Sequence, residues 1–200
     1  MIVVDSSFLI NSSPLVKTYT LDEFFALPEP KDYSKMELIN GVLYMSPMPD
    51  WRHSNIIEKV DSLLREFIKS QQIGGRVYRP RAGIQRTKTT WLEPDLFYLS
   101  KESLIHFEKE IPTTADLVIE VLSLSTFEYD KTTKADTYEA LGVRELWLVD
   151  ADTKQIEVRE NLNANTKWDR IVVYEEGDFL ESKVMEGLRF CIDEIVGKSG

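Results

Sequence analysis

Apolar residues recur every three or four positions in two long segments of the chain. Residues 51–68 show this spacing throughout, which predicts a helix with one face in the core. Residues 129–141 show it as well and are followed by Gly142, a residue type that often ends a helix. The sequence therefore predicts two long helices, each with one apolar face.

Other apolar runs are short and bounded by turn residues, as expected of strands. Asn40 and Gly41 separate two such runs and predict a tight hairpin of type I′. Residues 117–122 are apolar at every position except Glu120, which indicates a strand buried on both faces. The predicted strands are the two arms of the hairpin at 36–45 and the segments 76–79, 82–86, 95–99, 117–122, 144–150, 155–160 and 168–174, with a turn near 88–90.

One predicted helix lies between two predicted strands. The order strand 117–122, helix 129–141, strand 144–150 is typical of a crossover, and a crossover joins parallel strands. The sequence therefore predicts the α/β class and a sheet with parallel character.

The amino-terminal part of the chain divides near residue 18. Residues 1–17 show no sustained periodicity and are interpreted as a loose arm. Thr20 and Glu23 match the capping box of a short helix that should end near Pro28. A chain of 200 residues can bury one sizeable core, so residues 18–200 are predicted to form a single domain.

Composition argues against several classes of protein. Cys191 is the single cysteine, so an internal disulfide is impossible and a zinc fold is not expected. No apolar run reaches the roughly 20 residues that span a bilayer, and Asp5 stands where a secretory signal carries Lys or Arg. We therefore expect a cytoplasmic protein with no membrane association.

The charge of the chain is −10 but is unevenly distributed. Between Phe67 and Leu92 there are cations and no acid, although a strongly acidic protein is not expected to bind nucleic acid in general. This basic strip has two interpretations: a nucleic-acid-binding surface, or a solvated hairpin whose charges prevent edge-to-edge aggregation. The candidate nucleic-acid-binding residues are Arg76, Arg79, Arg81, Arg86 and Lys88.

Two carboxylates mark the candidate chemistry. Asp95 follows a proline at the start of one strand, and Glu120 lies in the middle of another. If the strands are neighbours, the two charges repel by roughly 4 kcal/mol at 4 Å and an effective dielectric constant near 20, so a proton, a lysine or a metal must offset them. Lys134 is expected to face the sheet from its helix, which permits either a buried ion pair with Glu120 or a site for Mg²⁺ or Mn²⁺, the ions that suit hard oxygen ligands.

Four motifs together carry a resemblance to a known family. They are Pro94-Asp95, residues 120–123, residues 130–138 and residues 142–150, with weaker similarity at residues 20–24, at residues 37–41 and at His53. In combination they resemble the Uma-two family of restriction-endonuclease-like proteins, which is part of the PD-(D/E)XK nuclease superfamily. The resemblance covers roughly residues 18–175.

The resemblance implies a restriction-endonuclease-like core, in which helices flank a central mixed β-sheet, and often a homodimer. It also implies a metal-dependent endonuclease that hydrolyses phosphodiester bonds of DNA. Asp95, Glu120 and the backbone carbonyl of Val121 would hold Mg²⁺ or Mn²⁺. Lys134 would orient the attacking hydroxide or stabilise the developing negative charge.

Two further residues have both a catalytic and a plain interpretation. Glu37 is expected to complete the metal shell or to hold a water, unless it is an ordinary exposed acid of the hairpin. His53 is expected to contact phosphate or to orient Glu37, unless it is a hydrogen-bonded packing residue at the end of its helix.

The chain departs from the superfamily pattern at Leu122, where the usual lysine would stand two residues after the acid. This departure and the net charge of −10 favour a second hypothesis. In it, the chain is a catalytically inactive module of nuclease fold that binds nucleic acid or a protein partner.

Overall fold

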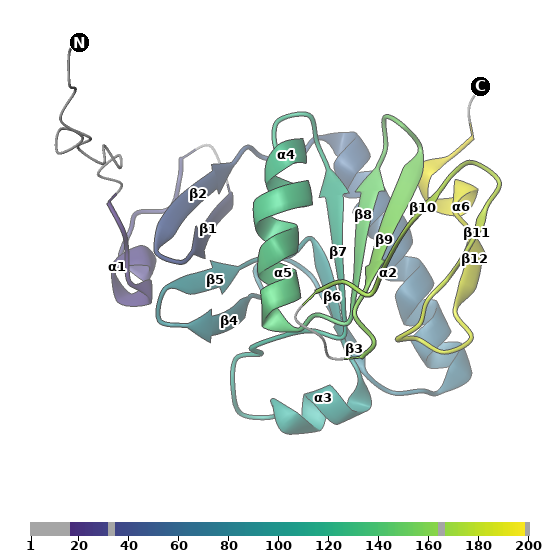
Figure 1. The fold of residues 1–200 in the computed structure, drawn as a ribbon, viewed down its shortest axis with the longest axis horizontal. Coiled ribbons are helices and arrows are strands. Elements are labelled where there is room, and N and C mark those ends of the chain that lie inside the picture. The colour runs from purple at the N-terminus through teal and green to yellow at the C-terminus, as the bar shows by residue number, and fades with distance from the viewer. Residues whose placement is uncertain (1–16, 32–34, 164–166, 199–200) are drawn as a thin grey trace, which may run out of the picture.

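A six-stranded mixed sheet forms the centre of the structure, a computed structural model that describes residues 17–31, 35–163 and 167–198 (Figure 1). The order of its strands is β10-β9-β8-β7-β6-β3. Their bounds are Arg170–Tyr174 for β10, Gln155–Glu160 for β9, Glu145–Asp150 for β8, Leu117–Leu122 for β7, Leu96–Leu99 for β6 and Arg76–Tyr78 for β3. Only β7 and β8 pair in parallel, so the predicted crossover and the α/β class are confirmed.

Helices cover both faces of this sheet (Figure 1). Helix α2, Trp51–Gln71, packs on one face through Ile56, Val60 and Leu64. The crossover packs on the other face as one continuous helical segment, made of α4 (Phe127–Tyr129), the π-helical turn η2 (Asp130–Lys134) and α5 (Ala135–Leu141). Both long predicted helices are therefore present, and the second contains a π turn that its apolar spacing did not indicate.

A smaller antiparallel sheet lies beside the central one, with the order β2-β1-β5-β4 (Figure 1). Its strands are β1 (Lys35–Ile39), β2 (Val42–Ser46), β4 (Ile84–Thr87) and β5 (Thr90–Leu92). Asn40 and Gly41 connect β1 to β2 with positive φ angles of 50° and 83°, as a type I′ turn requires, so the predicted hairpin is confirmed. Strand β5 was missed because the turn predicted near residues 88–90 ends at Thr89 and leaves only three residues for the strand.

The remaining elements are short. The capping box of Thr20 and Glu23 is present and starts α1, Leu21–Phe25. The other elements are α3 (Lys101–His106), β11 (Phe179–Glu181), β12 (Arg189–Cys191) and α6 (Asp193–Val196). The sequence did not predict β11, β12 and α6, since strands of three residues and a helix of four show too little periodicity. The proposed arm at residues 1–17 lies outside the described residues except for Lys17.

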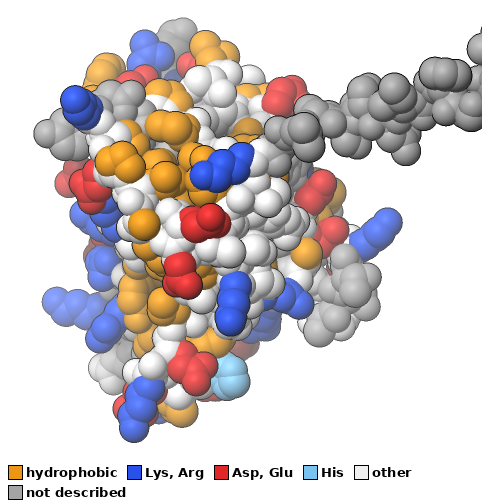
Figure 2. All heavy atoms as spheres, turned by 90° about the vertical axis from the view of Figure 1, so that its left-hand side faces the viewer, with side chains coloured by type: hydrophobic (Ala, Val, Ile, Leu, Met, Phe, Trp, Pro, Cys, Tyr) orange, Lys and Arg blue, Asp and Glu red, His pale blue; other side chains and the backbone are white. Residues whose placement is uncertain are grey.

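Apolar side chains are exposed on the face of the smaller sheet, and Lys and Arg lie around them with Asp and Glu in between (Figure 2). Met45 of β2 and Phe25, the last residue of the neighbouring helix α1 (Leu21–Phe25), are both largely exposed. No helix in the described ranges is both long and apolar enough to cross a membrane.

Candidate functional site

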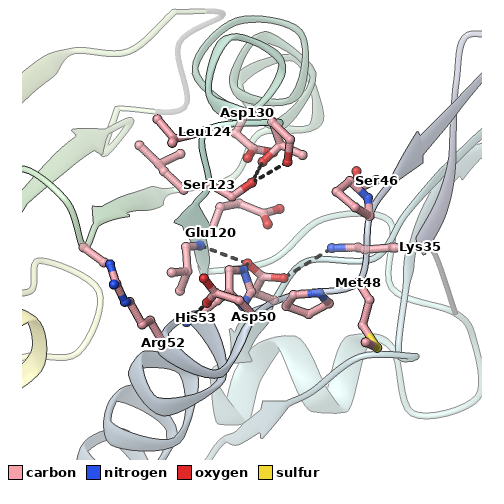
Figure 3. Close-up of a pocket in the computed structure, with 18 of the residues that line it drawn as sticks. Lys35, Ser46, Met48, Asp50, Arg52, His53, Glu120, Ser123, Leu124 and Asp130 are labelled. Atoms are coloured by element: carbon pink, nitrogen blue, oxygen red, sulfur yellow. Dashed lines mark hydrogen bonds and ion pairs between the residues drawn. The ribbon is translucent and has the colours of Figure 1, made fainter. Parts of the chain in front are cut away.

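The two carboxylates predicted to form the site meet at the end of β6 and β7. The antiparallel register pairs Leu96 with Ile119, so the next position places Asp95 opposite Glu120. Both residues line a cavity of about 510 Å³ beside the first turn of α2 (Figure 3). The prediction that neighbouring strands bring the two acids together is confirmed.

Asp95 has three partners, although the sequence argument left it unpaired. Its Oδ2 accepts a hydrogen bond from the Val121 N–H at 2.9 Å and lies 3.0 Å from His53 Nε2. Its Oδ1 lies 3.4 Å from Lys35 Nζ, which reaches across the cavity from β1 (Figure 3). Burial alone would raise the pKa of Asp95, but the charge of Lys35 and the hydrogen bond from His53 outweigh burial and hold that pKa well below its usual range.

Glu120 is bound from the opposite side by the crossover helix. Its Oε1 lies 2.6 Å from Lys134 Nζ and accepts a hydrogen bond from the Tyr138 hydroxyl. Burial raises the pKa of Glu120 to about 7, because the charge of Lys134 offsets only part of the cost of removing the carboxylate from water. The environments of Asp95 and Glu120 thus push their pKa values apart, as in carboxylate pairs that divide acid and base roles.

Lys134 is the buried centre of a cluster of ion pairs. Its side chain is only 2% exposed, which confirms that it faces the sheet. Besides Glu120, its Nζ lies 3.3 Å from Glu37 Oε2 and 3.7 Å from Asp130 Oδ1. The ion pair with Glu120 that was the alternative interpretation is therefore present, but it is one part of a larger network.

Glu37 is held rigidly within this network. Its Oε1 accepts a hydrogen bond from the Glu93 N–H at 2.9 Å, and the Tyr129 hydroxyl donates to its Oε2 at 3.3 Å. The residue is 1% exposed, which excludes the interpretation of Glu37 as an exposed acid of the hairpin.

His53 contacts Asp95 and not Glu37, so the expectation that it orients Glu37 is wrong. Burial alone would lower the pKa of the imidazole, but the hydrogen bond to Asp95 raises it. Its Nδ1 is buried and has no hydrogen-bond partner within the described part of the chain. The imidazole therefore takes its orientation from Asp95.

Three residues of the cluster were missed from the sequence. Lys35 is two positions before Glu37 on a strand, so the period of two places both on one face and could have revealed it. Asp130 is four positions before Lys134, the spacing of a helical ion pair. Tyr138 is fully buried, and its hydroxyl contacts Glu120.

The donor set of this cluster suits a hard divalent cation. The cluster contains the four carboxyl groups of Glu37, Asp95, Glu120 and Asp130 but only the two lysines Lys35 and Lys134. With all four carboxyl groups ionised and His53 neutral, two negative charges would be uncompensated, and a bound cation would favour that ionised state. Within the described residues, no three His, Cys, Asp or Glu side chains are grouped as a ready-made metal site. Mg²⁺ is commonly bound by one or two carboxylates and keeps several waters, so Asp95 and Glu120 fit it without a third acid.

The predicted basic strip does not reach this cavity, since none of its five residues lines it. Arg79 lies 2.5 Å from Asp61, Arg81 lies 3.1 Å from Glu29, and Arg86 donates to a backbone carbonyl. Arg76 and Arg81 line a second cavity of about 530 Å³. Nucleic-acid binding by Arg76, Arg79, Arg81, Arg86 and Lys88 stays a prediction.

Comparison with known proteins gives one family and one fold. The sequence profile of the family Uma2, described as "Putative restriction endonuclease", matches residues 21–193. A crystal structure described as a putative nuclease belonging to DUF820, from Anabaena variabilis ATCC 29413, is similar with a TM-score of 0.71. The two sequences are 23% identical, and the match covers 89% of this chain and 97% of that chain. No curated protein matches the chain.

Proposed function

The chain belongs to the Uma2 family of restriction-endonuclease-like proteins, and from this premise we propose that it is a metal-dependent endonuclease that hydrolyses phosphodiester bonds of DNA. One observation carries the proposal. Asp95 and Glu120 lie opposite each other on neighbouring strands, beside a cavity, in a cluster of four carboxyl groups and two lysines. Such a pair of hard oxygen ligands is what metal-assisted phosphodiester hydrolysis requires.

We assign the metal ligands to Asp95, Glu120 and the carbonyl of Val121. The Val121 N–H already faces Asp95, and in a strand the N–H and C=O of one residue point to the same side. Bound Mg²⁺ or Mn²⁺ would lower the pKa of a water ligand and polarise the scissile phosphate. His53 would hold the Asp95 carboxylate in place, and Lys35 would lie beside that carboxylate in the cavity.

Lys134 and Glu37 would act on the nucleophile. Lys134 Nζ lies 2.6 Å from Glu120, so a water held by Glu120 would lie next to a cation. That cation would orient the attacking hydroxide or stabilise the charge that develops on the phosphate. Glu37 is fixed by Glu93 and Tyr129 and would hold a second water or complete the metal shell.

A second candidate function is a catalytically inactive module that binds nucleic acid or a protein partner. It is supported by Leu122 at the position of the usual lysine and by the saturation of Asp95, whose oxygens already have three partners. In such a module, the lysines of the cluster would stand in for the metal and stabilise the fold.

A cleavage time course on supercoiled, linear and single-stranded DNA with Mg²⁺ or Mn²⁺ tests the nuclease. We expect metal-dependent cutting that Asp95→Asn and Glu120→Gln each reduce at least about 100-fold, because each variant replaces a proposed charged metal ligand with an amide. Asp136→Asn, which removes an exposed acid from α5, is the matched control and should cut at the wild-type rate. Equal cutting by wild type and both site variants would reject the proposal, and no cutting on any substrate would favour the inactive module.

A further inference from the structure

Three large apolar side chains are exposed at the opening of the site cavity. Met48, Trp51 and Leu124 line the cavity, and they are 62%, 70% and 89% exposed. They come from two parts of the chain: Met48 and Trp51 from residues 48–51, where the connection from β2 leads into α2, and Leu124 from the turn after β7. We name these three residues the apolar rim. Exposure of such large apolar side chains to water costs free energy. Their grouping beside a candidate active site points to a ligand that covers them.

Two of the three rim residues are held in place by the backbone around them. Pro47 and Pro49 flank Met48 and restrict the φ angles around it. Asp50 caps α2 by accepting the N–H of His53 at 2.9 Å, which fixes the first turn that carries Trp51. The indole therefore belongs to the same helical turn as the imidazole that contacts Asp95. In Figure 3, Met48 and Leu124 lie on opposite sides of the cavity.

The few free cations around the cavity indicate that a nucleic acid would bind there mainly by stacking of its bases and less by contacts to its phosphates. Among its described lining residues, Lys35 and Lys134 are engaged by carboxylates, so Arg52 is the exposed cation. A duplex is bound mainly through many contacts to its phosphates, and one arginine supplies little of that attraction. Stacking of one base on an aromatic side chain strengthens binding roughly 5- to 150-fold and does not depend on net charge.

We propose that the apolar rim stacks unpaired bases, so that the site takes single-stranded nucleic acid in preference to a continuous duplex. Trp51 supplies the aromatic surface on which an unpaired base can stack. Bases within a duplex already stack on each other, so they cannot also stack on an indole. Arg52 lies 5.8 Å from the centre of the Trp51 ring and 3.7 Å from Asp152, with a largely exposed side chain. It can exchange Asp152 for a backbone phosphate next to the stacked base. This inference rests on the proposed function only in one respect, namely that the bound strand would then be cut.

Fluorescence anisotropy with labelled oligonucleotides of 20 nucleotides measures binding, and EDTA in the buffer prevents metal-dependent cutting. We expect single-stranded DNA to bind at least about 10-fold more tightly than its duplex. Trp51→Ala should weaken single-strand binding about 10- to 100-fold and leave duplex binding unchanged, and Trp51→Phe should keep most of the affinity. A single-stranded RNA of the same sequence shows whether the site prefers one sugar.

Phe179→Ala is the matched control. Phe179 is 50% exposed and has the Arg189 guanidinium 4.0 Å from its ring centre, so it also pairs an exposed aromatic ring with an arginine. It does not line the cavity, and its replacement should leave single-strand binding at the wild-type level.

Several results would overturn the inference. They are equal affinity for single strand and duplex, an unchanged affinity in Trp51→Ala, or an equal loss in Phe179→Ala. Sedimentation showing that Trp51→Ala converts a dimer to monomers would assign the apolar rim to self-association instead. The cleavage assay tests the proposed function separately. Single-strand binding that depends on Trp51, without any cutting, would reject the nuclease but keep this subsite. Cutting that Trp51→Ala does not change would support the nuclease but reject this subsite.

Discussion

At the scale of single residues, the cluster is organised around one buried lysine. Lys134 contacts the carboxylates of Glu120, Glu37 and Asp130 within 3.7 Å. Burial alone would lower the pKa of Lys134, but Glu120 and Glu37 outweigh it, so its pKa is raised well above the ordinary value and the ammonium stays charged. Removing this charge would leave three buried carboxylates facing one another.

We therefore expect Lys134→Met to lower the free energy of unfolding by about 3–5 kcal/mol, the usual cost of breaking a buried pair by removing one partner. Urea denaturation followed by circular dichroism measures the change. Lys131→Met is the control, since Lys131 pairs with Glu157 at 2.6 Å but is 30% exposed and should cost no more than about 1 kcal/mol. An equal loss in both variants would contradict a special role for Lys134 in holding the cluster together.

At the scale of secondary-structure elements, the crossover helix reaches the site at its π turn η2. The Ala135 N–H bonds to the Asp130 carbonyl five residues back, so the helix contains one residue more than a regular α-helix needs. The π turn takes up this extra residue, so Tyr129, five positions before Lys134, lies on the same side of the helix, and both residues contact Glu37. Helical spacing alone does not reveal such an insertion, because the apolar stripe continues on either side of it.

Deletion of Thr132, an exposed residue of η2, tests this. Because the π turn takes up one extra residue, the deletion should restore a regular helix in which Tyr129 and Asp130 still lie on the same side as Lys134. We expect helical content by circular dichroism to stay unchanged and the free energy of unfolding to change by less than about 1 kcal/mol, because the buried polar groups keep their partners. Thr132→Ala keeps the helix length and is the control, with an equally small expected change. A loss of about 3 kcal/mol in the deletion variant alone would show that the extra residue itself is needed to build the cluster.

At the scale of the whole molecule, negative charge is concentrated where the metal is proposed. The chain has a net charge of −10, and the cluster beside the cavity has more carboxylates than lysines. Arg79 and Arg81 are meanwhile paired with acids, so much of the positive charge of the basic strip is already compensated within the fold. The molecule as a whole is thus better suited to bind a cation than to attract a duplex.

Mg²⁺ or Mn²⁺ should therefore raise the melting temperature. A ligand that binds only the folded state at 100 times its Kd adds about 2.7 kcal/mol of stability. Differential scanning fluorimetry with and without EDTA measures this, and the shift should be abolished in Asp95→Asn and kept in Asp136→Asn. A shift of the same size in Asp95→Asn would place the cation elsewhere.

Prediction from the sequence succeeded for the elements whose sequence patterns are local and extend over several residues. The capping box at Thr20, the hairpin at residues 40–41 and the buried strand β7 depend on neighbours in the chain. It failed for β5, β11 and β12, which are three residues long and form by pairing with distant strands. In the site, apolar surroundings singled out Asp95, Glu120 and Lys134, because buried charges need partners. The structure brings these three residues and Glu37 into one cluster, and their roles in catalysis stay predictions.

The sequence by itself determined the α/β class, the crossover and the acids that would need a partner, since periodicity and the cost of burying charge act within short segments. Only the tertiary structure decided which residues pair with these acids. The positions of β1 and of the first turn of α2 set Lys35 and His53 on Asp95, and the packing of the crossover helix set Lys134 on Glu120 and Glu37. The exposed rim around Trp51 also depends on the tertiary structure, because Leu124 comes from the turn after β7 and lies far from Met48 and Trp51 in the sequence.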